Sequence, residues 1–148
     1  MKRILFVCTG NTCRSPMAEY LLKAKASEHF EVRSAGLAAW PGQDAHEHVK
    51  TLLAQRGIEV KHQSQQANEE LIRWADLVLS MTQAQAELLK KQFPDDQDKI
   101  YPLKVYVQPD EKEPDIADPF GGDLAVYEKT LAEIEKWLEE FLKKEGIH

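Results

Sequence analysis

The strongest constraint on the fold is a strand signal, a short loop and a helix signal that follow one another near the start of the chain. Residues 4–7 are a compact apolar run, Ile-Leu-Phe-Val, and residues 8–15 read Cys-Thr-Gly-Asn-Thr-Cys-Arg-Ser. Pro16 then suits the first position of a helix. A loop between a strand end and a helix start brings backbone N–H groups together, and those groups favour a bound anion.

The rest of the chain repeats this alternation of strand and helix signals. Strands are expected at residues 3–7, 30–34, 77–79 and 100–103, and helices at residues 16–28, 45–56, 68–74, 83–92 and 123–144. Longer loops are expected at residues 36–44 and 109–119. Buried strands that alternate with helices predict an α/β fold, an open parallel sheet with helices on both faces. The chain has 148 residues, which predicts a single domain over residues 1–148.

Composition narrows the class of protein. The net charge of −6 and the lack of a basic run argue against a nucleic-acid partner. No apolar stretch reaches membrane length, so no membrane partner is expected. The two cysteines, Cys8 and Cys13, provide no disulfide framework, which fits a reducing compartment and predicts a cytoplasmic protein.

Cys8 and Arg14 are the best candidates for chemistry. Loop N–H groups and a helix dipole favour a thiolate at Cys8, and the Arg14 guanidinium is a two-pronged clamp for phosphate oxygens. Displacement of a phosphoryl group by the Cys8 thiolate is therefore expected, with Asp118 as the acid that protonates the leaving group. On spacing alone Asp118 competes with other loop aspartates, and a lone strand-end cysteine is often only a small buried hydrophobe.

The other loop residues also fit structural or functional roles. Gly10 and Asn11 adopt positive φ at low cost, as an anion-binding loop requires. Ser15 is most simply a helix cap, and its hydroxyl could also hydrogen-bond the Cys8 thiolate and assist its release; the two roles are compatible. Cys13 is either an inert buried thiol or the partner of an oxidised Cys8 in a reversible disulfide.

Two motifs resemble the low-molecular-weight protein tyrosine phosphatase family. They are residues 7–19, from Val7 to Glu19, and the run Asp118-Pro119-Phe120; residues 32–36, His62 and residues 75–81 also look like family landmarks. The resemblance implies a doubly wound sheet of four parallel strands and no metal or organic cofactor. It implies a phosphocysteine intermediate on Cys8, phosphate binding by Arg14 and the loop amides, and Asp118 as acid and then base. It also implies a loop-supporting hydrogen-bond network of Asn11, Ser15, Ser34 and His62.

The sequence departs from the tyrosine-specific pattern of that family. Thr9 and Thr12 stand where bulky apolar residues are usual, and Phe120 and Gly121 stand where tyrosines are usual. These features are similar to the bacterial protein arginine phosphatases of the family. Thr12 disfavours a phenol ring and tolerates a planar guanidinium, on which Phe120 or Trp40 could stack. The expected substrate-binding set is Thr9, Gly10, Asn11, Thr12, Cys13, Ser15, Phe120 and Trp40.

Phosphorylated proteins are the expected partners, phosphoarginine the expected substrate, and a monomer the expected state. The nearest alternative is a tyrosine phosphatase of the same fold. Arsenate reduction on this scaffold generally needs additional cysteines, and only Cys8 and Cys13 are present. A phosphocysteine carrier module is a further alternative, but it has no need of Arg14 or of a lid aspartate.

Overall fold

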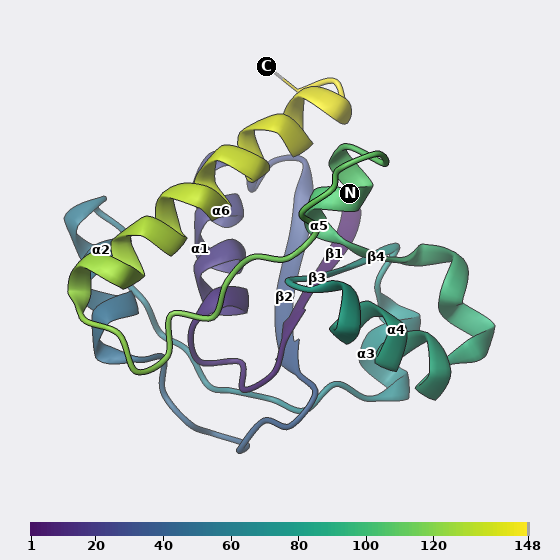
Figure 1. Ribbon diagram of the computed structural model, residues 1–148, viewed down its shortest axis with the longest axis horizontal. Coiled ribbons are helices and arrows are strands. Elements are labelled where there is room, and N and C mark those ends of the chain that lie inside the picture. The colour runs from purple at the N-terminus through teal and green to yellow at the C-terminus, as the bar shows by residue number, and fades with distance from the viewer. Residues whose placement is uncertain (148) are drawn as a thin grey trace.

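A computed structural model describes residues 1–147 as one α/β domain with helices on both faces of a four-stranded sheet (Figure 1). The strands are β1 (Lys2–Cys8), β2 (Phe30–Gly36), β3 (Leu77–Ser80) and β4 (Ile100–Pro102). The helices are α1 (Arg14–Ala26), α2 (Glu47–Gln55), α3 (Glu69–Trp74), α4 (Gln83–Gln92), the 3₁₀ helix η1 (Pro94–Lys99), α5 (Leu103–Val107) and α6 (Leu124–Lys144). The predicted fold class is confirmed.

The sheet is parallel and its strand order is β2-β1-β3-β4. The chain runs from β1 through α1 to one neighbour, β2, and later from β3 through α4 to β4 on the other side. The winding direction therefore reverses between β1 and β3. In open α/β sheets, ligands bind beyond the carboxyl ends of the strands at this reversal. Cys8, the last residue of β1, lies at that end.

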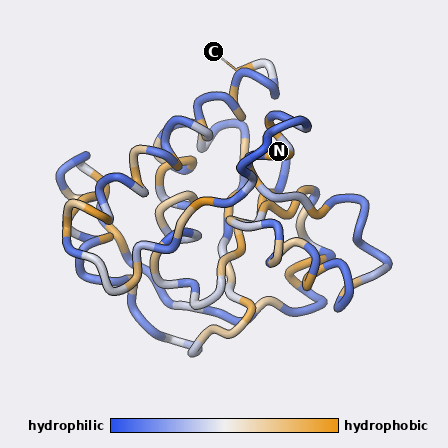
Figure 2. Tube along the Cα trace, viewed as in Figure 1, coloured by the Kyte–Doolittle hydropathy of each residue, from blue (hydrophilic) through white to orange (hydrophobic). Residues whose placement is uncertain are grey.

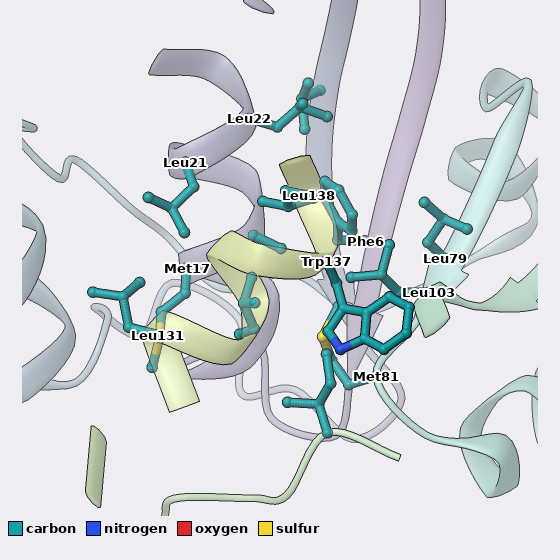
Figure 3. Packing of buried hydrophobic residues seen from close by; sticks show 14 of the residues in the cluster. Phe6, Met17, Leu21, Leu22, Leu79, Met81, Leu103, Leu131, Trp137 and Leu138 are labelled. Carbon is teal, nitrogen blue, oxygen red and sulfur yellow. The ribbon is translucent and has the colours of Figure 1, made fainter. Parts of the chain in front are cut away.

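Alternate residues of β1 pack into separate apolar clusters. Ile4 and Phe6 contact the cluster formed with α1, α2, α5 and α6, whereas Leu5 and Val7 contact the smaller cluster formed with α3 and α4. Figure 3 shows Phe6 among side chains of α1 and α6. The hydropathy trace in Figure 2 shows the accompanying alternation of apolar and polar residues along α6. Burial on both faces explains the continuous apolar run of β1.

Several boundaries differ from the sequence-based expectations. The fourth strand ends at Pro102, and Leu103 begins the short helix α5, which had not been expected. The 3₁₀ helix over residues 94–99 was missed as well. α2 begins at Glu47, because the Nδ1 of His46 accepts a hydrogen bond from the backbone N–H of His48 and caps the helix. Within residues 1–147, no helix is long and apolar enough to cross a membrane.

Candidate active site

The loop from Cys8 to Ser15 is held open by hydrogen bonds to its carbonyl groups. The carbonyl oxygen of Cys8 accepts from the N–H of Leu37 at 3.0 Å, and that of Thr9 accepts from the N–H of Ala38 at 2.9 Å. Gly36 makes this approach possible, because a Cβ there would lie 2.6 Å from the Thr9 carbonyl oxygen. The chain that follows β2 therefore fixes the first half of the loop.

The second half of the loop is held in the same way. The carbonyl oxygen of Asn11 accepts from Nε2 of His62 at 2.7 Å and from the hydroxyl of Ser64 at 2.8 Å, and that of Thr12 accepts from the N–H of His46 at 3.0 Å. No hydrogen bond in the described part of the chain uses the N–H groups of residues 9–15. With several carbonyl oxygens bound from behind, these N–H groups are available to an anion.

Asn11 organises the loop from within. Its φ of 56° is the only positive value at a non-glycine residue in the described chain. Its Nδ2 donates at 2.9 Å to the hydroxyls of both Ser15 and Ser34, and its Oδ1 accepts from the N–H of Gln65 at 3.0 Å. Because Ser15 accepts from Asn11, its own proton is free to point to Sγ of Cys8, 2.9 Å away. Because this series of hydrogen bonds ends in a donor to Sγ, it favours a negative charge on the sulfur.

The expectation that Ser15 caps the first helix is wrong. The helix begins at Arg14, and the position before it, Cys13, provides no side-chain cap. Ser15 therefore lies inside the first turn, where its hydroxyl is committed to Asn11 and Cys8. The alternative reading, a hydrogen bond to the Cys8 sulfur, agrees with the contact found.

A buried carboxylate completes the network behind the loop. The hydroxyl of Ser34 donates to Oε1 of Glu19 at 2.5 Å, and Oε2 of Glu19 pairs with Nζ of Lys23 at 2.6 Å. Nδ1 of His62 lies 3.9 Å from the same Oε1. Since the Asn11 carbonyl oxygen can only accept, the Nε2 of His62 carries a proton. Thus Ser34 and His62 both lie in contact with Asn11, as the resemblance implies.

Arg14 and Asp118 meet at the mouth of the site. The Arg14 side chain is buried, its Nη1 donates to the carbonyl oxygen of Ile116 at 2.8 Å, and its Nη2 lies 3.7 Å from Oδ2 of Asp118. Asp118 remains 54% exposed, and its Oδ1 accepts from the N–H of Phe120 at 3.0 Å. The segment before α6 thus brings a carboxylate over the loop while leaving it accessible to a substrate.

These groups enclose a cavity of about 280 Å³. Its lining consists of Cys8, Thr9, Gly10, Thr12, Cys13, Arg14, Gln43, Asp118 and Phe120. Asn11 and Ser15 are fully buried and lie behind this lining. Trp40 is 78% exposed and lines a neighbouring depression instead, so its contact with substrate stays a prediction. A larger groove, along α1 and the outer edge of β2, contains neither Cys8 nor Asp118.

Cys13 has a different environment from Cys8. Its sulfur lies 3.5 Å from the hydroxyl of Tyr127, a fully buried residue of α6 whose ring stacks on His46 at 4.7 Å. Burial raises the pKa of the Cys13 thiol, and burial raises the pKa of Tyr127 as well. Both cysteines are free thiols in this structure, and a disulfide between Cys8 and Cys13 stays a prediction.

Comparison with known proteins identifies the family. Residues 3–146 match the family described as low molecular weight phosphotyrosine protein phosphatase. The chain belongs to this family. It is 45% identical to a protein-arginine-phosphatase of Geobacillus stearothermophilus, over 96% of this chain and 95% of that protein. It is 34% identical to a low molecular weight protein-tyrosine-phosphatase of Acinetobacter johnsonii, over 96% of each chain.

A solved structure adds a chemical observation. A cysteine-to-serine mutant of the YwlE arginine phosphatase, with a phosphorylated active site serine, has a TM-score of 0.91 and 41% sequence identity to this chain. The match covers 96% of this chain and 94% of that one. The active-site serine of that mutant therefore carries a phosphoryl group.

Several residues that shape the site had no role assigned to them from the sequence, although Glu19 lies within the first family motif. Glu19 and Ser64 are buried behind the loop, Gln65 binds the Asn11 side chain through its backbone, and Gln43 lines the cavity. Of these residues, only Glu19 has a local sequence feature that indicates a special role, because it is a charged residue in a part of α1 that is otherwise rich in apolar residues. Nothing local distinguishes Ser64 or Gln65, since their contacts are made across the fold.

Proposed function

We propose that the protein hydrolyses phosphoarginine on proteins through a phosphocysteine intermediate at Cys8. The observation that carries this proposal is the donor chain from Asn11 through Ser15 to the Cys8 sulfur, at the base of a cavity lined also by Arg14 and Asp118. A sulfur that receives a hydrogen bond inside a loop of free N–H groups suits a nucleophile that attacks a phosphoryl group.

The first step transfers the phosphoryl group to sulfur. The Cys8 thiolate attacks phosphorus, an S–P bond forms, and the P–N bond to the arginine side chain breaks. Asp118 gives its proton to the departing nitrogen, which takes the electron pair of the broken bond, so that the arginine side chain leaves as a guanidinium. Arg14 and the loop N–H groups hold the three phosphoryl oxygens, whose charge they stabilise during transfer.

The second step releases phosphate. A water molecule attacks phosphorus, Asp118 accepts the proton of that water, and the S–P bond breaks to return the thiolate. The exposure of Asp118 and its contact with Arg14 suit both roles, because the carboxylate faces the cavity and remains accessible to water. Ser15 stabilises the sulfur when it leaves, through the same hydrogen bond that holds it beforehand.

The choice of phosphoarginine has two supports. The first is that the relative named as an arginine phosphatase is 45% identical, whereas the relative named as a tyrosine phosphatase is 34% identical. The second is Thr12, which lines the cavity and presents a hydroxyl in place of apolar bulk. A phenol ring gains from apolar walls, about 0.8 kcal/mol for each buried CH₂-sized group, whereas a guanidinium gains from hydrogen bonds.

Paired phosphopeptides test this proposal. Phosphoarginine and phosphotyrosine peptides of otherwise identical sequence are compared by kcat/KM, and the protein is expected to prefer phosphoarginine. Thr12→Ile should shift the preference towards phosphotyrosine. Thr12→Val, which removes the hydroxyl with little change of shape, separates the effect of the hydroxyl from that of bulk. If the wild-type protein prefers phosphotyrosine, the substrate assignment is wrong; if Thr12→Ile leaves the preference unchanged, Thr12 is not the selector.

A tyrosine phosphatase is the second candidate, because the matched family is described by phosphotyrosine. Both candidates share the chemistry of Cys8, Arg14 and Asp118, and only the leaving group differs. In either case phosphorylated proteins are the proposed partners. Turnover with water that is abolished in Cys8→Ser distinguishes both from a carrier module, which would only pass the phosphoryl group on.

A further inference from the structure

Gln85 is a buried polar residue that the reaction described above does not use. It lies in the first turn of α4 with 6% of its surface exposed. Its side-chain Oε1 accepts from the backbone N–H groups of Met81 and Thr82, each at 3.0 Å. The backbone N–H of Gln85 donates to the hydroxyl of Thr82 at 3.1 Å. Gln85 therefore forms a capping box at the helix start.

The capping contacts fix which way the Gln85 amide faces. Backbone N–H groups only donate, so the two groups at Met81 and Thr82 require the carbonyl oxygen. The Nε2 of Gln85 is thereby directed to the opposite side, where it donates to the hydroxyl oxygen of Thr9 at 3.2 Å. The hydroxyl of Thr9 is consequently an acceptor towards α4, and its proton is free to point elsewhere.

Thr9 is exposed and lines the cavity beside Cys8 and Arg14. The arrangement repeats the one found at the nucleophile, where the Asn11 amide donates to a hydroxyl whose proton then faces the sulfur. In both places the NH₂ group of a buried amide with a fixed orientation donates a hydrogen bond to a hydroxyl oxygen. That hydroxyl proton is then available to an acceptor in the cavity.

We propose that Gln85 is a positioning residue that acts through Thr9, keeping the Thr9 proton directed into the cavity as a hydrogen-bond donor to an oxygen of the phosphorylated substrate. This inference rests on the proposed function, because it requires a phosphoryl group in the cavity above Cys8. Gln85 itself touches no substrate. The proposed donor is Thr9, and its orientation is set from the first turn of α4.

Gln85→Glu reverses the polarity of this contact with almost no change of shape. One carboxylate oxygen can still accept from Met81 and Thr82, so the cap is kept. The other oxygen can only accept, so it draws the Thr9 proton away from the cavity. The expected result is a loss of about tenfold in kcat/KM and a matching loss in the affinity for inorganic phosphate as a competitive inhibitor, the equivalent of one hydrogen bond.

The new carboxylate also adds negative charge near the cavity. A double-mutant cycle separates the effect of this charge from the effect of the redirected Thr9 proton. Thr9→Val removes the hydroxyl, and by itself it is expected to lower kcat/KM by a similar factor. In the Thr9→Val background, Gln85→Glu should then lower kcat/KM only slightly further. In the Thr9→Ser background, which retains a hydroxyl, Gln85→Glu should have its full effect on kcat/KM. Equal effects of Gln85→Glu in the wild-type and Thr9→Val backgrounds would mean that charge alone acts, and would overturn the inference.

The cycle is measured on phosphoarginine peptide, on phosphotyrosine peptide and by phosphate inhibition. Thermal unfolding of each variant shows whether the cap is intact; if Gln85→Glu unfolds early, Thr9→Val against Thr9→Ser still tests whether the hydroxyl proton matters. Failure of the wild-type protein to hydrolyse either peptide would contradict the proposed function. Normal wild-type turnover without coupling between Thr9 and Gln85 would contradict this inference alone.

Discussion

Asn11→Ala is expected to destabilise the protein by about 4 kcal/mol. The side chain makes three hydrogen bonds, to Ser15, Ser34 and the N–H of Gln65, and each contributes about 1 kcal/mol. Alanine must also adopt the φ of 56° that Asn11 has, which costs an L residue without a local polar side chain about 1 kcal/mol more. The hydroxyls of Ser15 and Ser34 keep their contacts with Cys8 and Glu19 but lose the hydrogen bond that the Asn11 amide donates to each of them.

Urea unfolding measures this change as a shift of the midpoint at constant slope. Ser64→Ala is the matched control, since it removes a single hydrogen bond to the Asn11 carbonyl and should cost about 1 kcal/mol. Asn11→Gly separates the two contributions, because glycine adopts positive φ freely but also loses all three side-chain contacts. The reasoning is refuted if Asn11→Ala costs no more than Ser64→Ala.

The remaining predictions concern Gly36 and the ionisation of Cys13 and Tyr127. Gly36→Ala should sharply reduce both stability and activity, because its Cβ would meet the Thr9 carbonyl oxygen at 2.6 Å; an active, stable variant would show that the loop does not need this close approach. Alkaline pH should destabilise the protein from about pH 8.5 upwards, because burial raises the pKa of Cys13 and of Tyr127, so the unfolded chain loses these protons first. Tyr127→Phe should reduce this dependence above pH 10, as measured by urea unfolding across pH.

Much of the fold is readable in the sequence because local signals agree with the tertiary structure. The apolar run of β1 is buried on both faces, and the apolar side of α6 packs into the cluster shared with α1, α2 and α5, so the periodicity reports their environment directly. The short helix α5 was missed because it begins immediately at the end of β4, where Pro102 and Leu103 read equally well as strand.

Spacing alone predicted only the part of the site whose residues are neighbours in the sequence, whereas Asp118, Ser34 and His62 were expected from the family resemblance. Cys8 and Arg14 share one loop, and the spacing alone suggests their proximity. Asp118 lies far along the chain, and spacing could not separate it from other loop aspartates; its contact with Arg14 is a product of the fold. For Ser15, the reading as a helix cap is wrong although serine is common at that position, whereas the second reading, a hydrogen bond to the Cys8 sulfur, agrees with the structure.

The central claim is that the Cys8 sulfur becomes covalently phosphorylated during turnover. The direct measurement is rapid acid quench of the enzyme with phosphopeptide, followed by mass spectrometry of the peptide that contains residues 8–14. Asp118→Asn, which lacks the base of the second step, should accumulate the adduct when the substrate is an aryl phosphate with a good leaving group. The account predicts a phosphoryl group on Cys8 and none in Cys8→Ala. A phosphoryl group on any other residue, or full turnover by Cys8→Ala, would contradict it.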